Sequence, residues 1–376
     1  MTERMRSVVV GTTVVIIGLI TLAIPLVLSS SNLEIYVDIG LFTIVVSGLS
    51  LLMGFAGQVS LGQAAFYGIG AYTAAIMAVH KWPSLVALIA APIVTAAIAF
   101  LIGIPLLRLK GHALAFGTLA VQLILLAIIP ETPSFTGGSI GLSAIPPLRI
   151  GPLAISSGKD YAYLVWIVAV AVLIITRNLT RSRPGRGLRA MATTPSGASA
   201  TGVQVESYKL RDFALSAAYA GIAGGIYVFF IGYISPDAFP VMLSIEFVIM
   251  VVVGGIGTIS GAFVGAAVIT IISQILTSLG TSPSLPPQLP TVLSLGVYAV
   301  ILIAILRLIP SGIVGALSEL WKKTQRTPSA ASSRSSEERQ EVASAVDGAG
   351  RTDSVLTGEL QSRDATMVKE TSTGQQ

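Results

Sequence analysis

Long apolar runs separated by short polar stretches dominate the chain as far as Ile309. A bilayer core of about 30 Å requires roughly 20 apolar residues in a helix, so each long run predicts one transmembrane helix. The pattern therefore predicts an all-α polytopic membrane protein with about ten spans, or eight to eleven, depending on how the short and glycine-broken runs are counted. The predicted spans are Ser7–Leu28, Ile35–Met53, Gln63–Val79, Ser84–Leu106, Ala113–Pro130, Tyr161–Thr176, Phe213–Ile234, Ile245–Ile259, Gly261–Leu279 and Thr291–Ile309.

The first run, Ser7–Leu28, is predicted to be a retained helix and not a cleaved signal peptide. It is longer than a typical signal-peptide core and lacks a small-residue cleavage site.

The positions of Lys and Arg predict the orientation of the spans. With both termini in the cytoplasm, the cytoplasmic side receives 15 of the basic residues before position 327 and the opposite side receives three, namely Lys81, Arg149 and Lys159. Basic residues accumulate on the cytoplasmic side of membrane proteins, so this imbalance supports ten crossings with both ends inside.

The chain after position 326 has a different composition. Residues 327–376 hold 13 of the 41 charged residues and 15 Ser or Thr, but no aromatic residue. Such a segment buries too little apolar surface to offset the entropy of ordering. The sequence thus predicts a membrane domain over 1–326 and a disordered cytoplasmic tail over 327–376.

Composition and charge exclude several function classes. The chain has no cysteine, and its two histidines, His80 and His112, have no partner at ligand spacing, so no metal site is predicted. The net charge of +5 is explained by the membrane-anchoring Lys and Arg residues, so nucleic acid is not an expected partner.

The spans contain few ionisable residues. Asp38 and Glu246 lie near the predicted outer surface and Arg307 lies at an inner end, so no acidic or basic group is predicted at mid-membrane, which argues against proton coupling. No converging nucleophile, acid–base pair or ligand set indicates an enzyme. The chain also lacks a phosphate-binding loop, so any ATP-driven work would require ATP and Mg²⁺ to bind on other chains.

Glycine and polar residues alternate between the second and third predicted spans. Glycine at this density opens a helix or allows close helix contact, and non-helical backbone at membrane depth survives only inside protein or beside water. Packing is the favoured interpretation for Gly68 and Gly70. A solute pathway or its cytoplasmic gate is the favoured one for the polar members. The pathway candidates here are Gly54, Gly57, Gln58, Ser60, Gly62 and Gln63.

A second glycine cluster follows 200 residues later. Gly254, Gly257 and Ser260 repeat the spacing of Gly54, Gly57 and Ser60, and both clusters fall at predicted cytoplasmic turns. An internal duplication and chance both account for three matched positions. The two Gly-x-x-x-Gly pairs at Gly221–Gly225 and Gly261–Gly265 are interpreted as helix-packing motifs.

The longest predicted cytoplasmic connection, residues 177–212, has the features of a docking element. Thr194 suits a helix cap, Pro195 a first turn and Gly202 a left-handed end, with small residues including Gly197 and Ala198 between them. The alternative is a basic loop held near anionic lipid by residues such as Arg186 and Arg189.

Several segments together resemble the branched-chain amino acid permease family of ABC importers, its LivM-type branch most of all. The resemblance covers roughly residues 35–315 and is carried by the segments 54–75, 107–120, 135–142, 182–190, 208–210, 221–225, 232–236 and 254–265.

This resemblance implies a permease subunit of a bacterial inner membrane that works by alternating access. The implied partners are a second permease subunit, two ATP-binding subunits and an extracytoplasmic solute-binding protein. The resemblance also implies that Pro195–Thr201 is the helix that contacts the ATPase. The family's acidic residues in this loop are replaced by Thr193 and Pro195 here, which puts the polar part of that contact in doubt.

The implied solute is a branched-chain or related amino acid. Urea and small organic acids, which related permeases import, remain open, and so does an ATP-independent channel or secondary carrier.

Overall fold

The computed structural model describes Pro25 and residues 30–109, 111–151, 153–200, 202, 204–280, 296–297, 300, 307 and 312–316. All of these belong to one compact unit, residues 1–316. The first predicted span apart from Pro25, the tenth predicted span apart from positions 296, 297, 300 and 307, and the predicted tail lie outside the described residues.

The other eight predicted spans each coincide with a helix. Six of the helices are long and apolar enough to cross a membrane by themselves, α11 reaches that length together with the residues before it, as Pro236–Gly254, and α3 is a shorter apolar helix. The prediction of a multi-span α-helical membrane protein is therefore confirmed. The helices are α2 (Ser30–Phe55), α3 (Gln63–Val79), α4 (Ser84–Leu106), α5 (His112–Glu131), α7 (Gly158–Arg181), α10 (Val205–Ile231), α11 (Val241–Gly254) and α12 (Ile259–Gly280).

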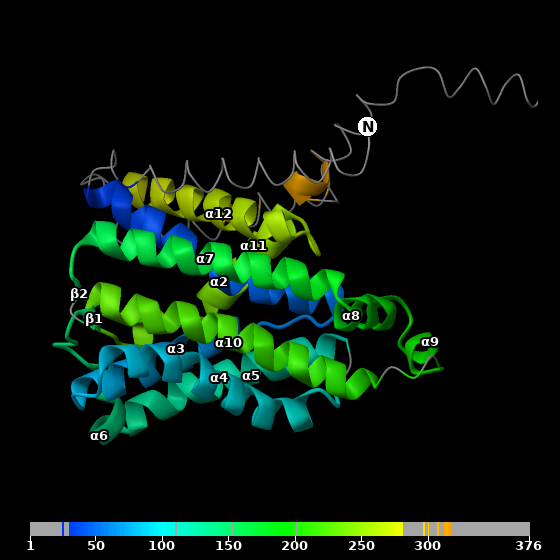
Figure 1. Cartoon of the computed structure of the whole chain (residues 1–376), viewed down its shortest axis with the longest axis horizontal. Helices are drawn as coiled ribbons and strands as arrows, with labels where there is room; N and C mark the ends of the chain where they lie inside the picture. The colour runs from blue at the N-terminus through cyan, green and yellow to red at the C-terminus, as the bar shows by residue number, and fades with distance from the viewer. Residues whose placement is uncertain are drawn as a thin grey trace, which may run out of the picture. The chain divides into compact units, whose positions relative to one another are not determined.

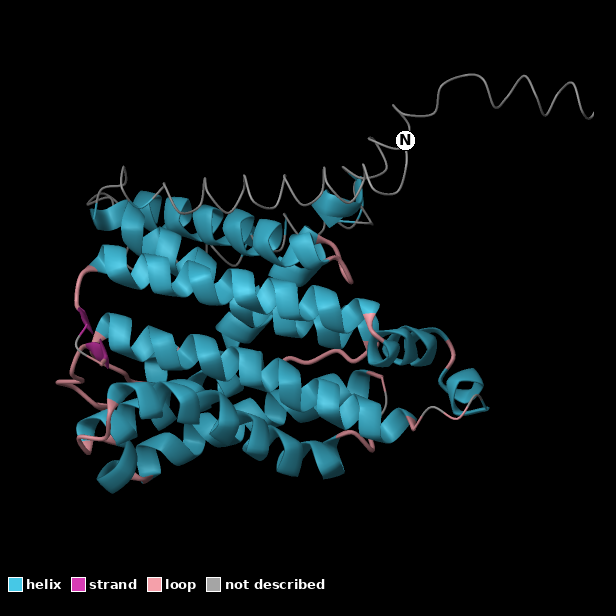
Figure 2. Ribbon diagram, in the orientation of Figure 1, coloured by secondary structure: helices cyan, strands magenta, loops and turns pink. Residues whose placement is uncertain are grey.

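Short elements occupy the two opposite ends of this helical bundle (Figure 1). One end, here called the β1–β2 end, carries α6 (Pro133–Thr136) and an antiparallel pair of strands, β1 (Leu148–Ile150) and β2 (Leu153–Ile155). The other, the α8–α9 end, carries α8 (Arg183–Thr193) and α9 (Pro195–Ala200). The hairpin, coloured magenta in Figure 2, is an addition to the all-α prediction. Three-residue strands are too short to produce a readable alternation of apolar and polar residues.

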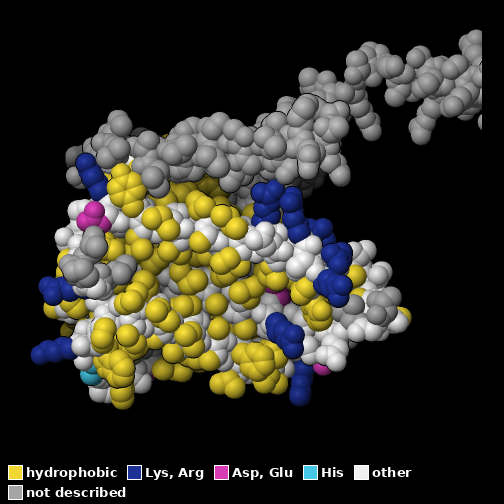
Figure 3. Space-filling model, in the orientation of Figure 1, with side chains coloured by type: hydrophobic (Ala, Val, Ile, Leu, Met, Phe, Trp, Pro, Cys, Tyr) yellow, Lys and Arg dark blue, Asp and Glu magenta, His cyan; other side chains and the backbone are white. Residues whose placement is uncertain are grey.

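A broad apolar band covers the side of the bundle between its two ends, and basic side chains flank the band at both ends (Figure 3). The outer helices supply much of this band: only 22% of the best window of α4 is buried, against 83% for α2. An apolar surface of this extent suits lipid or another membrane subunit and not water.

Small residues let the central helices approach closely. A Cβ built on Gly70 of α3 would overlap the backbone of Gly221 in α10, and one on Gly224 would overlap the carbonyl of Tyr67. Gly225 faces Ala91 of α4. The packing interpretation of Gly70 and of the Gly221–Gly225 pair is confirmed by these contacts.

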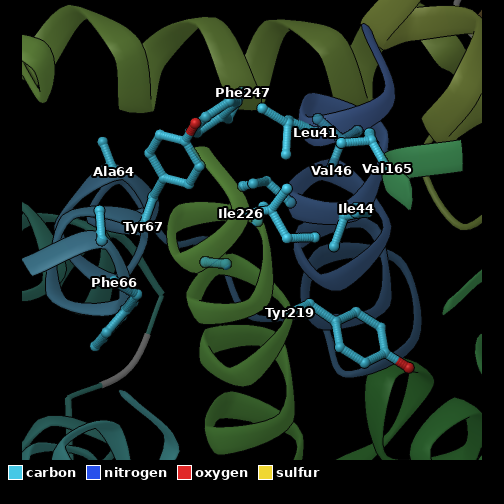
Figure 4. Close-up of a cluster of buried hydrophobic side chains, with 14 of the residues drawn as sticks. Leu41, Ile44, Val46, Ala64, Phe66, Tyr67, Val165, Tyr219, Ile226 and Phe247 are labelled. Atoms are coloured by element: carbon cyan, nitrogen blue, oxygen red, sulfur yellow. The ribbon is translucent and has the colours of Figure 1, made fainter. Parts of the chain in front are cut away.

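Helix α10 runs through the centre of the core, between α3 and α2 (Figure 4). Ile226 on α10 lies toward Ile44 of α2, and Tyr67 of α3 points toward Phe247 of α11. All four side chains are buried.

Candidate functional site

The chain leaves regular structure between α2 and α3, in residues 56–62, here called the first break. Gly57 adopts a positive φ of 65°, which glycine reaches without the steric cost other residues pay. Helix α3 then runs alongside α10 toward the β1–β2 end, since Gln63 contacts Ser216 and Gly70 contacts Gly221. With 17 residues it is about 26 Å long, less than the bilayer core.

Side chains of other helices satisfy the backbone where α3 begins. The Leu61 amide donates to Thr118 Oγ1 at 2.8 Å, and the Ala64 amide donates to Ser244 Oγ at 2.8 Å. Gln63 Nε2 donates to the carbonyl and hydroxyl oxygens of Ser216 at 3.0 and 3.1 Å. Buried backbone amides require such partners, so these polar side chains hold the start of the helix in place.

A second non-helical segment, residues 232–240, joins α10 to α11 and is here called the second break. It contains the 3₁₀ turn η1 (Pro236–Ala238). Gln122 of α5 closes it by donating from Nε2 to the carbonyls of Phe239 and Pro240 at 3.3 and 3.1 Å. Gln122 Oε1 also accepts a 2.6 Å bond from Ser244 Oγ. Because Ser244 bonds Ala64 as well, the short helices α3 and α11 begin beside each other.

The structure places the two glycine clusters in direct contact. Helix α2 ends next to the turn between α11 and α12, and a Cβ on Gly54 would overlap the backbone of Gly257. The second glycine of each cluster has a positive φ, 65° at Gly57 and 75° at Gly257. Gly254 packs on Gly261.

A Cβ built on Gly57 or on Gly257 would have its nearest atoms 3.6 and 3.5 Å away, which is ordinary contact. The obstacle at these two positions is the backbone conformation, whereas overpacking applies at Gly54.

The polar pathway candidates differ in their surroundings. Gln58 is 3% exposed, and within the described part of the chain neither end of its amide has a hydrogen-bond partner. Ser60 is also buried, and its Oγ accepts a long bond from the Gly62 amide at 3.5 Å. Ser260, by contrast, is exposed on the first turn of α12.

Asp212 departs most from the sequence analysis, which placed it just outside the seventh span. Helix α10 begins at Val205, so Asp212 is the eighth residue of a membrane-length helix, and it is only 4% exposed. Among the described residues neither carboxylate oxygen has a hydrogen-bond partner. The ionisable residues predicted inside the spans therefore did not include Asp212, which lies in a membrane-length helix and not in a loop.

The loop between α7 and α10 is attached to the end of α2 by a small buried cluster, here called the loop cluster. Its members are Leu51, Phe55, Ala56, Leu188, Met191 and Ala198. Leu188 and Met191 come from the inner face of α8, and Ala198 comes from α9. The guanidinium of Arg189 lies 5.1 Å from the centre of the Phe55 ring.

The same loop reaches the first break. A Cβ on Gly57 would lie 3.6 Å from the Cα and 3.7 Å from the Cβ of Ala192, at the end of α8. The loop predicted to dock on another protein therefore touches the segment predicted to line the pathway.

The predicted short helix in this loop is present as α9. The Thr194 carbonyl accepts the bond from the Ala198 amide, which makes Thr194 the cap position. Gly202 has a φ of 84°, the left-handed conformation expected after a helix end. Gly197 and Arg186 are exposed, and Arg186 Nη1 donates to the Arg181 carbonyl at 3.4 Å.

The sequence analysis missed four side chains that complete the two breaks. A lone Gln or Thr inside an apolar run was the available signal for Gln122 and Thr118. Ser216 and Ser244 gave no comparable signal, because single serines are common in membrane helices. Within the described residues, no group of three or more His, Cys, Asp or Glu could hold a metal ion.

Comparison with known proteins assigns the family. The model of a family described as branched-chain amino acid transport system / permease component matches residues 31–306. The chain belongs to this family. The resemblance drawn from the sequence is confirmed, and the interpretation of the permease as a transport subunit and not an enzyme agrees with it.

Two curated relatives are high-affinity branched-chain amino acid transport system permease proteins LivM. The one from Salmonella typhimurium is 30% identical over 279 residues, 67% of this permease and 65% of the relative. The one from Escherichia coli is 30% identical over 272 residues, 65% of this permease and 63% of the relative. The permease thus spans slightly less than two thirds of the length of these relatives.

A probable LivH permease protein of Methanocaldococcus jannaschii is 26% identical over 296 residues, which cover 76% of this permease and 91% of that protein. No solved structure matches the chain.

Proposed function

We propose that this permease is a membrane-spanning subunit of an ATP-driven importer for branched-chain or related amino acids. The family assignment supports the solute class, and LivM and LivH relatives carry that solute in their names. In this proposal the permease sits in a bacterial inner membrane beside a second permease subunit. Two ATP-binding subunits and an extracytoplasmic solute-binding protein complete the machine.

The α8–α9 end faces the cytoplasm in this proposal. The basic residues at the end of α7, in the loop that follows it and at the start of α10 are Arg177, Arg181, Arg183, Arg186, Arg189, Lys209 and Arg211. The β1–β2 end receives Lys81, Arg149 and Lys159. Positive residues favour the cytoplasmic side of the membrane, which supports this orientation.

The loop cluster is the observation that carries the proposed mechanism. It joins α9 to α2 through buried apolar contacts, so a force applied to α9 by an ATPase would act on the end of α2 and on the first break. Packed side chains transmit displacement because interiors have low compressibility. In α9 Ser196, Gly197, Ser199 and Ala200 are exposed and small, which suits insertion into a groove of a partner.

The test separates ATP hydrolysis from solute movement in proteoliposomes that contain the permease and all of its partners. Ala198→Glu places a charge in the loop cluster, and we expect uptake of labelled leucine to fall at least about 10-fold while ATP hydrolysis continues. Ala190→Glu is the matched control, because Ala190 is an exposed alanine of α8 outside the cluster, and uptake should stay within about twofold.

Unchanged uptake by Ala198→Glu would contradict the proposed coupling. Uptake by wild-type vesicles that lack the ATPases would instead favour the ATP-independent channel or carrier, and competition by urea or small organic acids would change the solute class.

A further inference from the structure

Several buried polar atoms near the first break have no partner, although buried polar groups nearly always have one. Within the described residues these atoms are both oxygens of Asp212, both amide atoms of Gln58 and Oε1 of Gln63. An unpaired buried carboxylate is costly, so a group that neutralises it is expected.

The helix geometry brings these residues to one level of the bundle. Helices α2 and α10 are antiparallel, since the end of α2 and the start of α10 meet at the loop cluster. They touch at Gly48, where a Cβ would lie 2.9 Å from the Ser216 carbonyl. Leu52 of α2 and Asp212 of α10 each lie one helical turn from this contact, about 6 Å toward the α8–α9 end. The two residues are therefore at the same height along the bundle.

The first break lies at the same height along the bundle as Leu52 and Asp212. The backbone N–H of Gln58 donates to the Leu52 carbonyl at 3.0 Å, so Gln58 lies beside the turn of α2 that faces Asp212. Gln63 bonds Ser216, which is one turn of α10 from Asp212.

The orientation of the Gln63 amide is fixed by its partner. The Ser216 carbonyl can only accept, so the nitrogen of Gln63 faces it and the oxygen is the unpartnered atom. This level of the bundle thus holds the two carboxylate oxygens of Asp212 and the amide oxygen of Gln63, and the side-chain amide of Gln58 also has no partner among the described residues.

We propose that Asp212, Gln58 and Gln63 form a buried site for one monovalent cation. Oxygen ligands select hard cations, and a single carboxylate balances a single positive charge. Irregular backbone beside a helix break is also where membrane transporters hold Na⁺. The shared chemistry is a small cation, and its two sources are an inorganic ion and the ammonium group of an amino acid solute.

Occupancy of this site would join α10 to the first break through the ion. Since the first break contacts the α7–α10 loop, the cation would stabilise one arrangement of these three segments relative to others.

The test measures the thermal unfolding midpoint of the full-length chain in lipid nanodiscs at constant ionic strength. We expect NaCl to raise the midpoint above that in choline chloride by at least about 3 °C, with saturation as Na⁺ increases. Asp212→Asn, which keeps the shape and removes the charge, should abolish this shift. Asp38→Asn, at a half-buried acidic residue of α2, should retain it.

The second arm adds leucine or 4-methylpentanoate, which lacks the ammonium group, in choline chloride. A shift with leucine alone that is lost in Asp212→Asn assigns the cation to the solute. Equal midpoints in every medium would overturn the site, and so would a sodium shift that survives Asp212→Asn. The wild-type comparison stands even if the variant fails to fold.

Discussion

The two breaks of the permease are built in different ways, although both lead into short helices that begin side by side. In the second break the side chain of Gln122 pairs with two backbone carbonyls and a serine hydroxyl, and Phe239 is fully buried among aromatic rings. In the first break the Gln58 side chain has no hydrogen-bond partner in the described chain, Gly57 has a positive φ, and Val59 is exposed.

This difference indicates which segment moves. A shift of the second break would break the three hydrogen bonds made by the Gln122 side chain, whereas the Gln58 side chain of the first break has none to lose among the described residues. The first break is also the one that touches α8. We therefore expect the second break to act as a fixed support and the first to rearrange during transport.

The largest expected effect follows from removing the support of the second break. Gln122→Leu leaves the carbonyls of Phe239 and Pro240 and the hydroxyl of Ser244 without this partner, which should cost about 3–5 kcal/mol. The thermal midpoint in nanodiscs should fall by roughly 10 °C. Gln58→Leu breaks no hydrogen bond, and in choline chloride its midpoint should change by no more than about 3 °C. Equal decreases of the thermal midpoint in the two variants would show that the two breaks are held with equal stability.

A smaller loss is expected where the two glycine clusters meet. Gly54→Ala forces the end of α2 away from Gly257, an overpacking that should cost about 1–3 kcal/mol and reduce ATP-driven uptake several-fold. Gly296→Ala serves as the control, since no atom of the described residues lies within 4 Å of a Cβ there. Normal uptake and stability of Gly54→Ala would show that the contact between the clusters is loose.

The smallest effect is expected at Gly57, where the conformation and not the space is limiting. Gly57→Ala should cost about 1 kcal/mol because of the positive φ, and Gly57→Asn should cost less, because asparagine tolerates this region. Denaturation midpoints of the two variants, measured side by side, check the order. An equal or larger loss for asparagine would point to crowding instead.

Most of the fold could be predicted from the sequence, because a membrane imposes a minimum length on each apolar run. The ends of Ser84–Leu106 and Gln63–Val79 agree with α4 and α3 to the residue. Asp212 was misplaced because Arg211 and Lys209 beside it suggested a loop, while α10 continues through them.

Less of the candidate site than of the fold could be predicted from the sequence. The glycines at Gly54 and Gly257 marked unusual backbone, but their mutual contact depends on how α2 and α11 pack. Gln122 pairs with carbonyls more than 100 positions away, and no local pattern encodes such a contact.

The central claim is that the α7–α10 loop must move against the first break during transport, and a reversible cross-link tests it most directly. The natural chain has no cysteine, and positions 57 and 192 have the Cβ separation of a disulfide, 3.7 Å. In proteoliposomes with all partners, oxidised Gly57→Cys/Ala192→Cys should lose at least about 90% of ATP-driven leucine uptake, and reduction should restore it. Neither single-cysteine variant should respond to oxidant. Full uptake by the cross-linked permease would contradict the account.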